Sequence, residues 1–248
     1  MIRKLDLSKL EPLYTKKIKC YICENTFTSL KVRSRFVKPL SVESDFGPVF
    51  KQEEPNNPLL YYVTVCPSCG FAFTEDSANY YGQMARKRVQ EEITAKREQN
   101  HDYCGKRDFP KAVSTYKLAI FSGQLVEAKH IVLANLCLRL AWLYRGASRK
   151  EEEERFLELA AFEYAQSYTY SDFDPQTTPE MKVLYLVGEL NRRLGNYNKA
   201  LQYFSTVTEH PEKSRYMKYV NLARQQWQLA VQEYKQEQLQ STNGITKE

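Results

Sequence analysis

Two pairs of cysteines place the strongest constraint on how this chain folds. The first pair is Cys20-Tyr-Ile-Cys23, and the second is Cys66-Pro-Ser-Cys69, which is followed by Gly70. Two Cys-x-x-Cys pairs beside strand-like sequence are typical of four thiolates that bind one structural zinc ion in a tetrahedral arrangement. We therefore expect one structural Zn²⁺, held by Cys20, Cys23, Cys66 and Cys69.

Other chemistries for these cysteines are weaker interpretations. Six cysteines in 248 residues are too few for a disulfide scaffold, and four protein ligands leave no coordination position for the water of a hydrolytic site. A redox dithiol is an alternative, but such motifs sit on a βαβ unit, which is not predicted here. Iron is another alternative. Cys104 and Cys137 are expected to pack as small apolar side chains, although His101 and Cys104 could form a second metal site.

The sequence around the cysteines predicts a small β-ribbon over residues 1–75. Lys31–Val37 alternates in a period of two, which indicates a half-exposed strand, and Tyr61–Val65 and Phe71–Phe73 read as further strands. Residues 38–60 contain four prolines and one glycine, which exclude a regular element. A loop of this length is either functional or held in place by its own aromatic residues, Phe46 and Phe50.

From residue 76 to about residue 236 the periodicity is helical, which predicts an all-α domain. Three segments share an alanine that is followed four residues later by an aromatic residue, namely Ala112/Tyr116, Ala160/Tyr164 and Ala200/Phe204. This is the pattern of the second helix of a tetratricopeptide repeat, although the copies lie further apart than the usual ~34 residues. The predicted fold class is α+β by segregation, with residues 1–75 as a zinc-ribbon-like domain, 76–236 as a tetratricopeptide-like helical array and 237–248 as a disordered tail.

In such an array the first helix of each repeat lines an inner surface. The register predicts that this surface carries Asn135, Leu138, Trp142, Lys182, Tyr185, Glu189 and Arg192. A mixture of aromatic and charged side chains suits an extended peptide, so a protein or peptide partner is expected there. The alternative is that the array only scaffolds the ribbon.

The net charge of +6 suggests nucleic acid as an alternative partner. Residues 1–75 hold 11 Lys/Arg and 8 Asp/Glu, an excess of +3. Four cysteines that bind Zn²⁺ lose four protons and gain two charges, so the excess falls to about +1. Lys31, Arg33 and Arg35 could still contact phosphates from the predicted strand, but solvated strand charges are the commoner explanation.

The sequence shows no Ser/His/Asp, paired-carboxylate or Gly-rich phosphate motif, and it has three histidines. We therefore expect a non-enzymatic adaptor or scaffold that mediates protein–protein interaction. A nucleic-acid-binding zinc ribbon and a thiol-based redox or zinc sensor are the alternatives. Since no apolar run reaches ~20 residues and no signal-peptide pattern follows the basic N-terminus, no membrane partner and a cytoplasmic location are expected.

The chain also resembles a known bacterial family, the domain of unknown function numbered 2225. The resemblance rests on Val32-Arg-Ser-Arg, Asp45-Phe46, the run from Asn57 to Phe71 that contains the second cysteine pair, and Leu140-Ala-Trp-Leu-Tyr-Arg145. It covers nearly the whole chain and implies a zinc ribbon followed by tetratricopeptide-like helices. The family pattern has a proline where this sequence has Tyr21, which removes no ligand. The resemblance brings no established activity.

Overall fold

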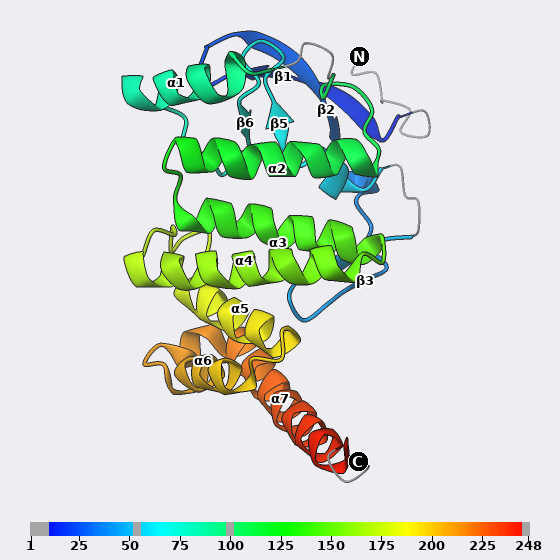
Figure 1. Cartoon of the computed structure of the whole chain (residues 1–248), viewed down its shortest axis with the longest axis vertical. Helices are drawn as coiled ribbons and strands as arrows, with labels where there is room; N and C mark the ends of the chain where they lie inside the picture. Colours follow the sequence, from blue (N-terminus) through cyan, green and yellow to red (C-terminus); the bar gives the residue numbers. More distant parts are fainter. Residues whose placement is uncertain (1–9, 52–55, 98–101, 245–248) are drawn as a thin grey trace, which may run out of the picture. The chain divides into compact units, whose positions relative to one another are not determined.

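The computed structural model describes residues 10–51, 56–97 and 102–244, with side chains through residue 240 (Figure 1). The chain divides into two compact units. Unit 1 comprises Met1–Ser41 and Pro48–Ala128, and unit 2 comprises Val42–Gly47 and Lys129–Glu248. The predicted fold class is confirmed, because short antiparallel hairpins precede the seven helices α1 to α7 of the described chain.

Unit 1 contains two hairpins that carry the cysteine pairs. Strand β1 (Leu13–Lys19) pairs with β2 (Thr26–Val32) in a register that runs from Leu13 opposite Val32 to Lys19 opposite Thr26. Strand β5 (Thr64–Val65) pairs with β6 (Ala72–Phe73). A third pair, β3 (Ser41–Val42) and β4 (Pro48–Val49), flanks residues 43–47. The turns η2 (Ser34–Phe36) and η3 (Pro58–Tyr61) are 3₁₀-helical.

Two helices complete the core of unit 1. Helix α1 (Gln83–Val89) continues as the π-helical turn η4 (Gln90–Thr94). Helix α2 (Phe109–Leu125) begins where the Asp108 carboxylate accepts from the Lys111 N–H at 2.9 Å. One buried cluster joins residues of both helical segments and both cysteine turns. The contact boundary therefore follows Ala128, whereas the sequence placed a domain boundary at residue 75.

Unit 2 is built from consecutive helices, each packed on the next, and α5 also contacts α7. They are α3 (His130–Gly146), α4 (Lys150–Tyr170), α5 (Glu180–Arg193), α6 (Tyr197–Glu209), η5 (Lys213–Tyr216) and α7 (Met217–Gly244). The repeated small and aromatic residues of α4 and α6 are buried, as are those of α2 in unit 1. Gly195, at φ +76°, follows the end of α5 and allows the chain to turn into α6.

Three local predictions differ from the structure. The strand predicted over Lys31–Val37 ends at Val32, because the chain turns into η2. Of the strand predicted over Tyr61–Val65, only Thr64–Val65 is extended, and Tyr61 closes η3. Residues 237–244, expected to belong to a disordered tail, continue α7, and residues 245–248 lie outside the described part of the chain. Among the described helices, none combines the length and apolar character needed to cross a membrane.

Candidate functional site

The four cysteines of the predicted zinc site come together in unit 1. Their Sγ atoms all lie within 4.8 Å of one another. The Sγ atoms of Cys20 and Cys69 are 3.6 Å apart, as are those of Cys23 and Cys66. A disulfide would require about 2.05 Å, whereas four sulfurs at ~2.3 Å from one central zinc ion lie about 3.8 Å apart. The spacing fits a tetrahedral metal site and no disulfide.

The two turns that present the cysteines have the same hydrogen-bond pattern. In the first, the Cys20 N–H donates to the Asn25 carbonyl, and the Glu24 N–H donates to the Cys20 carbonyl. In the second, Cys66 donates to Phe71, and Gly70 donates to Cys66. The residue after the second cysteine of each pair has a left-handed φ, +61° at Glu24 and +78° at Gly70. The pairs therefore lie in two equivalent turns, whose four thiols together could hold a metal ion.

Only one of these left-handed positions requires glycine for a packing reason. A Cβ atom at Gly70 would lie 2.9 Å from Cγ2 of Ile93 in η4. Glycine there permits both the turn and the close approach of η4. The first turn carries glutamate instead, whose carboxylate pairs with Lys19 at 3.0 Å.

The helical segment beside the cysteines holds both turns by their carbonyls. Arg86 of α1 donates to the Ile22 carbonyl of the first turn, and Arg97 donates to the Pro67 carbonyl of the second turn at 2.6 Å. The Thr94 hydroxyl donates to the Cys69 carbonyl at 2.8 Å. Two guanidinium groups thus lie beside a cluster that would carry a net charge of −2 with Zn²⁺ and four thiolates, and they partly balance this charge.

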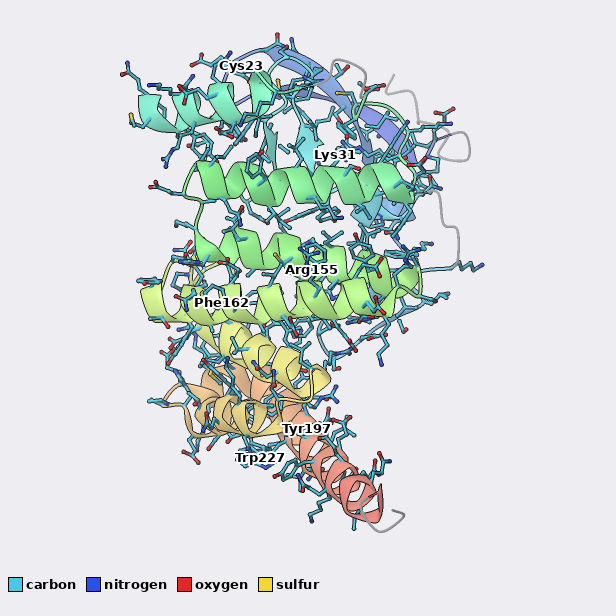
Figure 2. All side chains as sticks on the ribbon, in the orientation of Figure 1. Cys23, Lys31, Arg155, Phe162, Tyr197 and Trp227 are labelled. Atoms are coloured by element: carbon cyan, nitrogen blue, oxygen red, sulfur yellow. The ribbon has the colours of Figure 1, made fainter. Side chains whose placement is uncertain are left out.

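Cys20, Cys66 and Cys69 are buried, whereas Cys23 is exposed and is labelled in Figure 2. The hydrogen bond with Cys20 raises the pKa of the Cys69 thiol, and the neighbouring Cys66 and burial raise it further. The cluster therefore holds protons that a metal ion must displace, so metal affinity falls at low pH.

The other two cysteines, of which Cys104 was a candidate for a second metal site, do not join this cluster. Cys104 is half-buried, with Sγ 3.8 Å from the Val65 carbonyl oxygen, and Cys137 is buried in α3. Burial raises the pKa of both thiols, that of Cys137 to about 12. His101 lies outside the described residues. In the part of the chain that the structure describes, the four cysteines are the only group of three or more His, Cys, Asp or Glu side chains arranged to hold a metal ion.

The predicted partner surface of the helices is occupied by a segment of the chain itself. Residues 43–47 belong to unit 2 and contact four of the seven predicted residues, which are Trp142, Lys182, Tyr185 and Glu189. The other three predicted residues pack or pair among the helices. Leu138 is buried, Asn135 accepts from the Tyr164 hydroxyl at 2.8 Å, and Arg192 pairs with Glu189 and Glu233.

Asp45 lies at the centre of this contact and is fully buried. Its carboxylate accepts from Arg145 at 2.7 and 3.2 Å, from Trp142 Nε1 at 3.1 Å and from the Gly47 N–H at 3.0 Å. Burial alone would raise the pKa of Asp45, but the bonds from Arg145 and the nearby charge of Arg193 outweigh it and hold that pKa below its usual value. Asp45 is therefore an ionised carboxylate in a site that neutralises it.

The residues before Asp45 extend the polar contact. The Glu43 carboxylate lies 2.7 Å from Arg145 and 2.9 Å from Arg193. The Ser44 hydroxyl donates to Glu189 at 2.6 Å, and its carbonyl accepts from the Tyr185 hydroxyl at 2.7 Å. Three consecutive residues of the segment are thus bound by α3 and α5.

Phe46 fills an aromatic slot in the same surface. Its ring centroid lies 5.5 Å from that of Tyr185 and 6.3 Å from that of Tyr219, and the Nζ atoms of Lys182 and Lys218 lie 5.9 and 5.8 Å from it. Phe46 has φ +65°, a left-handed conformation that is unfavourable for a bulky side chain. The contacts in the slot must offset this strain.

The sequence reasoning missed several residues of this surface, namely Arg145, Arg193, Lys218 and Tyr219. The one useful signal was Phe46, an aromatic residue in a proline-rich loop that needed somewhere to pack. Nothing in the local pattern identified the helices as its destination.

Of the three basic residues of the nucleic-acid alternative, only Lys31 lies in a strand. Lys31, labelled in Figure 2, donates from Nζ to the carbonyls of Tyr61 at 3.1 Å and Tyr62 at 3.2 Å, and burial lowers its pKa to about 8. Arg33 donates to the Glu11 carbonyl at 3.1 Å and stacks on Tyr14. Arg35 lies on η2, beyond the strand.

Comparison with known proteins identifies the chain at the level of family. Neither a curated protein nor a solved structure matches it significantly. One family model matches residues 13–230, a span that includes the four cysteines, residues 43–47 and the helices that hold them. This chain therefore belongs to the family described as uncharacterized protein conserved in bacteria, DUF2225.

Proposed function

We propose that this protein is a non-enzymatic adaptor, stabilised by one structural zinc ion, whose helical unit binds short peptide segments in the manner of a tetratricopeptide array. The observation that carries the proposal is the contact with residues 43–47. The side chains that bind this segment lie on α3, α5 and α7, which are alternate helices of unit 2. A surface that binds five residues through charged and aromatic groups has the chemistry of a peptide-binding site.

The cysteine cluster supports the same function from the structural side. Four thiolates close the coordination sphere of Zn²⁺, so the ion would hold the two turns together and would leave no open position for a substrate. The second turn lies in a hairpin whose strands have two residues each, and a metal ion would fix this turn against the first.

Photo-crosslinking in bacterial cells that contain the natural partners tests the adaptor function. A benzophenone amino acid replaces Lys218, an exposed residue of α7 whose Nζ lies 5.8 Å from the Phe46 ring. The matched control carries the same group at Phe162, an exposed residue of α4 labelled in Figure 2. We expect discrete crosslinked proteins from position 218 that are absent from position 162. Identical products from both positions, or none from position 218, would contradict the proposal.

A further inference from the structure

The segment Glu43–Gly47 is bound as a ligand would be, through charged side chains that come from a distant part of the sequence. Glu43 and Asp45 face two guanidinium groups, Arg145 and Arg193, and two ammonium groups lie over Phe46. The acidic groups of the helices that pair with these guanidiniums are Glu153, 2.6 Å from Arg145, and Glu189, 2.8 Å from Arg193. Removal of the segment would take the carboxylates of Glu43 and Asp45 away from Arg145 and Arg193, and Glu189 is already shared with Arg192. The surface therefore favours an occupant that restores acidic groups.

The surface also selects shape. The Phe46 N–H donates to the Glu43 carbonyl, and the Glu43 N–H donates to the Gly47 carbonyl, both at 2.9 Å, so the segment is a tight turn closed by its own backbone. A Cβ atom at Gly47 would lie 2.9 Å from Cδ1 and Nε1 of Trp142 and from Oδ1 of Asp45. The position after the aromatic residue therefore accepts glycine and resists any larger residue.

The segment also lies far in sequence from the residues that bind it. Ser41 and Pro48, which flank it, group with unit 1, whereas Val42–Gly47 group with the helices of unit 2. The recognition elements begin about 100 residues later in the sequence, as the Arg145–Asp45 separation of 100 shows. A ligand tethered in this way binds intramolecularly, so it competes with free ligands at an effective concentration set by the length and stiffness of the connection.

From these observations we propose that the surface formed by α3, α5 and α7 is a recognition site for acidic–aromatic turns of the type Glu-x-Asp-Phe-Gly. A turn of this chemistry in a partner protein binds by displacing Glu43–Gly47, which acts as an internal competitor. The proposal deepens the adaptor function and rests on it, because it names the class of segment that the adaptor recognises.

The test uses the 248-residue chain supplied with zinc, and a synthetic peptide of residues 41–49 with blocked ends and a fluorescent label. Phe46→Ala removes the ring of the internal competitor and leaves its charge pairs, whereas Gly47→Ala crowds the turn against Trp142. Both variants weaken the binding of Glu43–Gly47 to the helical surface, and neither changes a residue of the helices. Circular dichroism and thermal denaturation establish that each variant is folded, so if one does not fold, the other carries the test.

Fluorescence anisotropy measures binding of the peptide to each chain. We expect the variants to bind the peptide at least about tenfold more tightly than the wild type, because the tethered competitor is weakened. A control peptide with Asp45→Asn should bind at least about tenfold more weakly than the original, since it loses the charge-assisted bonds to Arg145. Addition of the original peptide should also raise the melting temperature of Phe46→Ala.

Two results would overturn the proposal. If the folded variants bind both peptides equally, or no better than the wild type does, Glu43–Gly47 is a fixed structural contact only. If the wild-type chain is a dimer in solution that dissociates in Phe46→Ala, the occupant is the turn of a second copy. Failure of the adaptor function is separate, because crosslinks from position 218 without peptide binding leave the adaptor in place with a different ligand.

Discussion

Asp45 is a fully buried charged side chain and Lys31 a half-buried one, and the protein satisfies them in different ways. Asp45 forms a two-point contact with the guanidinium of Arg145, so its charge is balanced where it is buried. Lys31 donates to the uncharged carbonyls of Tyr61 and Tyr62, which accept two hydrogen bonds but do not balance its charge. Burial therefore lowers the pKa of Lys31 to about 8.

This pKa predicts how stability depends on pH. Lys31 has a pKa of about 8 in the folded chain and 10.5 as its ordinary value. Between these pH values the unfolded chain retains a proton that the folded chain has lost, so the free energy of unfolding rises with pH. We expect the wild type to gain up to about 3 kcal/mol over Lys31→Met between pH 8 and pH 10.5, as measured by urea unfolding with zinc present.

Lys117→Met is the matched control for this measurement. Lys117 is an exposed lysine of α2 in the same unit, so its replacement reports the effect of deleting a surface charge. If the stability difference between wild type and Lys31→Met is constant across this pH range, the Lys31 ammonium is not buried as described.

At the scale of helices, the packing of α5 on α6 depends on the absence of one side chain. Gly188 of α5 faces Phe204 of α6, and a Cβ atom at Gly188 would lie 2.7 Å from Cδ1 and Cε1 of that ring. Phe204 is fully buried, so the ring has little room to retreat. The small residue sets the distance between the two helices.

Replacing Gly188 with alanine should therefore destabilise the protein even though alanine favours helices. Overpacking costs about 1–3 kcal/mol, and the helix propensity of alanine offsets up to about 1 kcal/mol of this. Gly146→Ala is the control, because Gly146 is the last residue of α3 and its added Cβ would meet nothing within 4 Å. We expect denaturant unfolding to show a loss for Gly188→Ala and no loss for Gly146→Ala. Equal stability of the two variants would contradict the packing.

The elements show which parts of the fold a sequence can reveal. The alanine and aromatic positions of α2, α4 and α6 were predictable, because a buried helix face repeats at a fixed local spacing. The strand predicted through Val37 was wrong, because the alternation of charges continued into η2, which has no partner strand in the β1–β2 hairpin. Period-two polarity alone cannot report where pairing stops.

The two candidate sites differ in the same respect. The cysteine pairs were predictable, since each lies within four residues of chain and zinc chemistry supplies the rule that joins them. The destination of Asp45 was not, because its partners lie about 100 residues away and no periodicity connects them. Burial of a loop in a distant helical surface depends on tertiary contacts, which local patterns do not encode.

At the scale of the whole chain, the two sites are linked by sequence order. Cys23 and Cys66 flank Glu43–Gly47, so a metal ion bound by both pairs closes a chain loop that contains the segment. Closing a loop of this length removes conformational entropy worth about 4 kcal/mol from the unconstrained chain. The segment loses less entropy on binding when its loop is already closed.

Removal of the metal should therefore affect both sites. We expect about one zinc ion per chain by elemental analysis, and we expect Cys23→Ser to lower this content sharply, whereas Cys104→Ala leaves it unchanged, since Cys104 lies outside the cluster. In Cys23→Ser, the buried residues packed around Cys20, Cys66 and Cys69 should lose several kcal/mol of stability, as structural zinc sites do when the metal is absent.

The distinctive consequence lies at the segment itself. The N–H groups of Phe46 and Gly47 are hydrogen-bonded in the folded chain, so their exchange with deuterium reports release of the turn. We expect faster exchange over residues 43–47 in Cys23→Ser and in chelator-treated wild type than in Cys104→Ala. Unchanged exchange at these positions, in protein shown to lack metal, would mean that the helical surface holds the turn without help from the closed loop. Faster exchange would make zinc a determinant of how readily a competing partner segment enters.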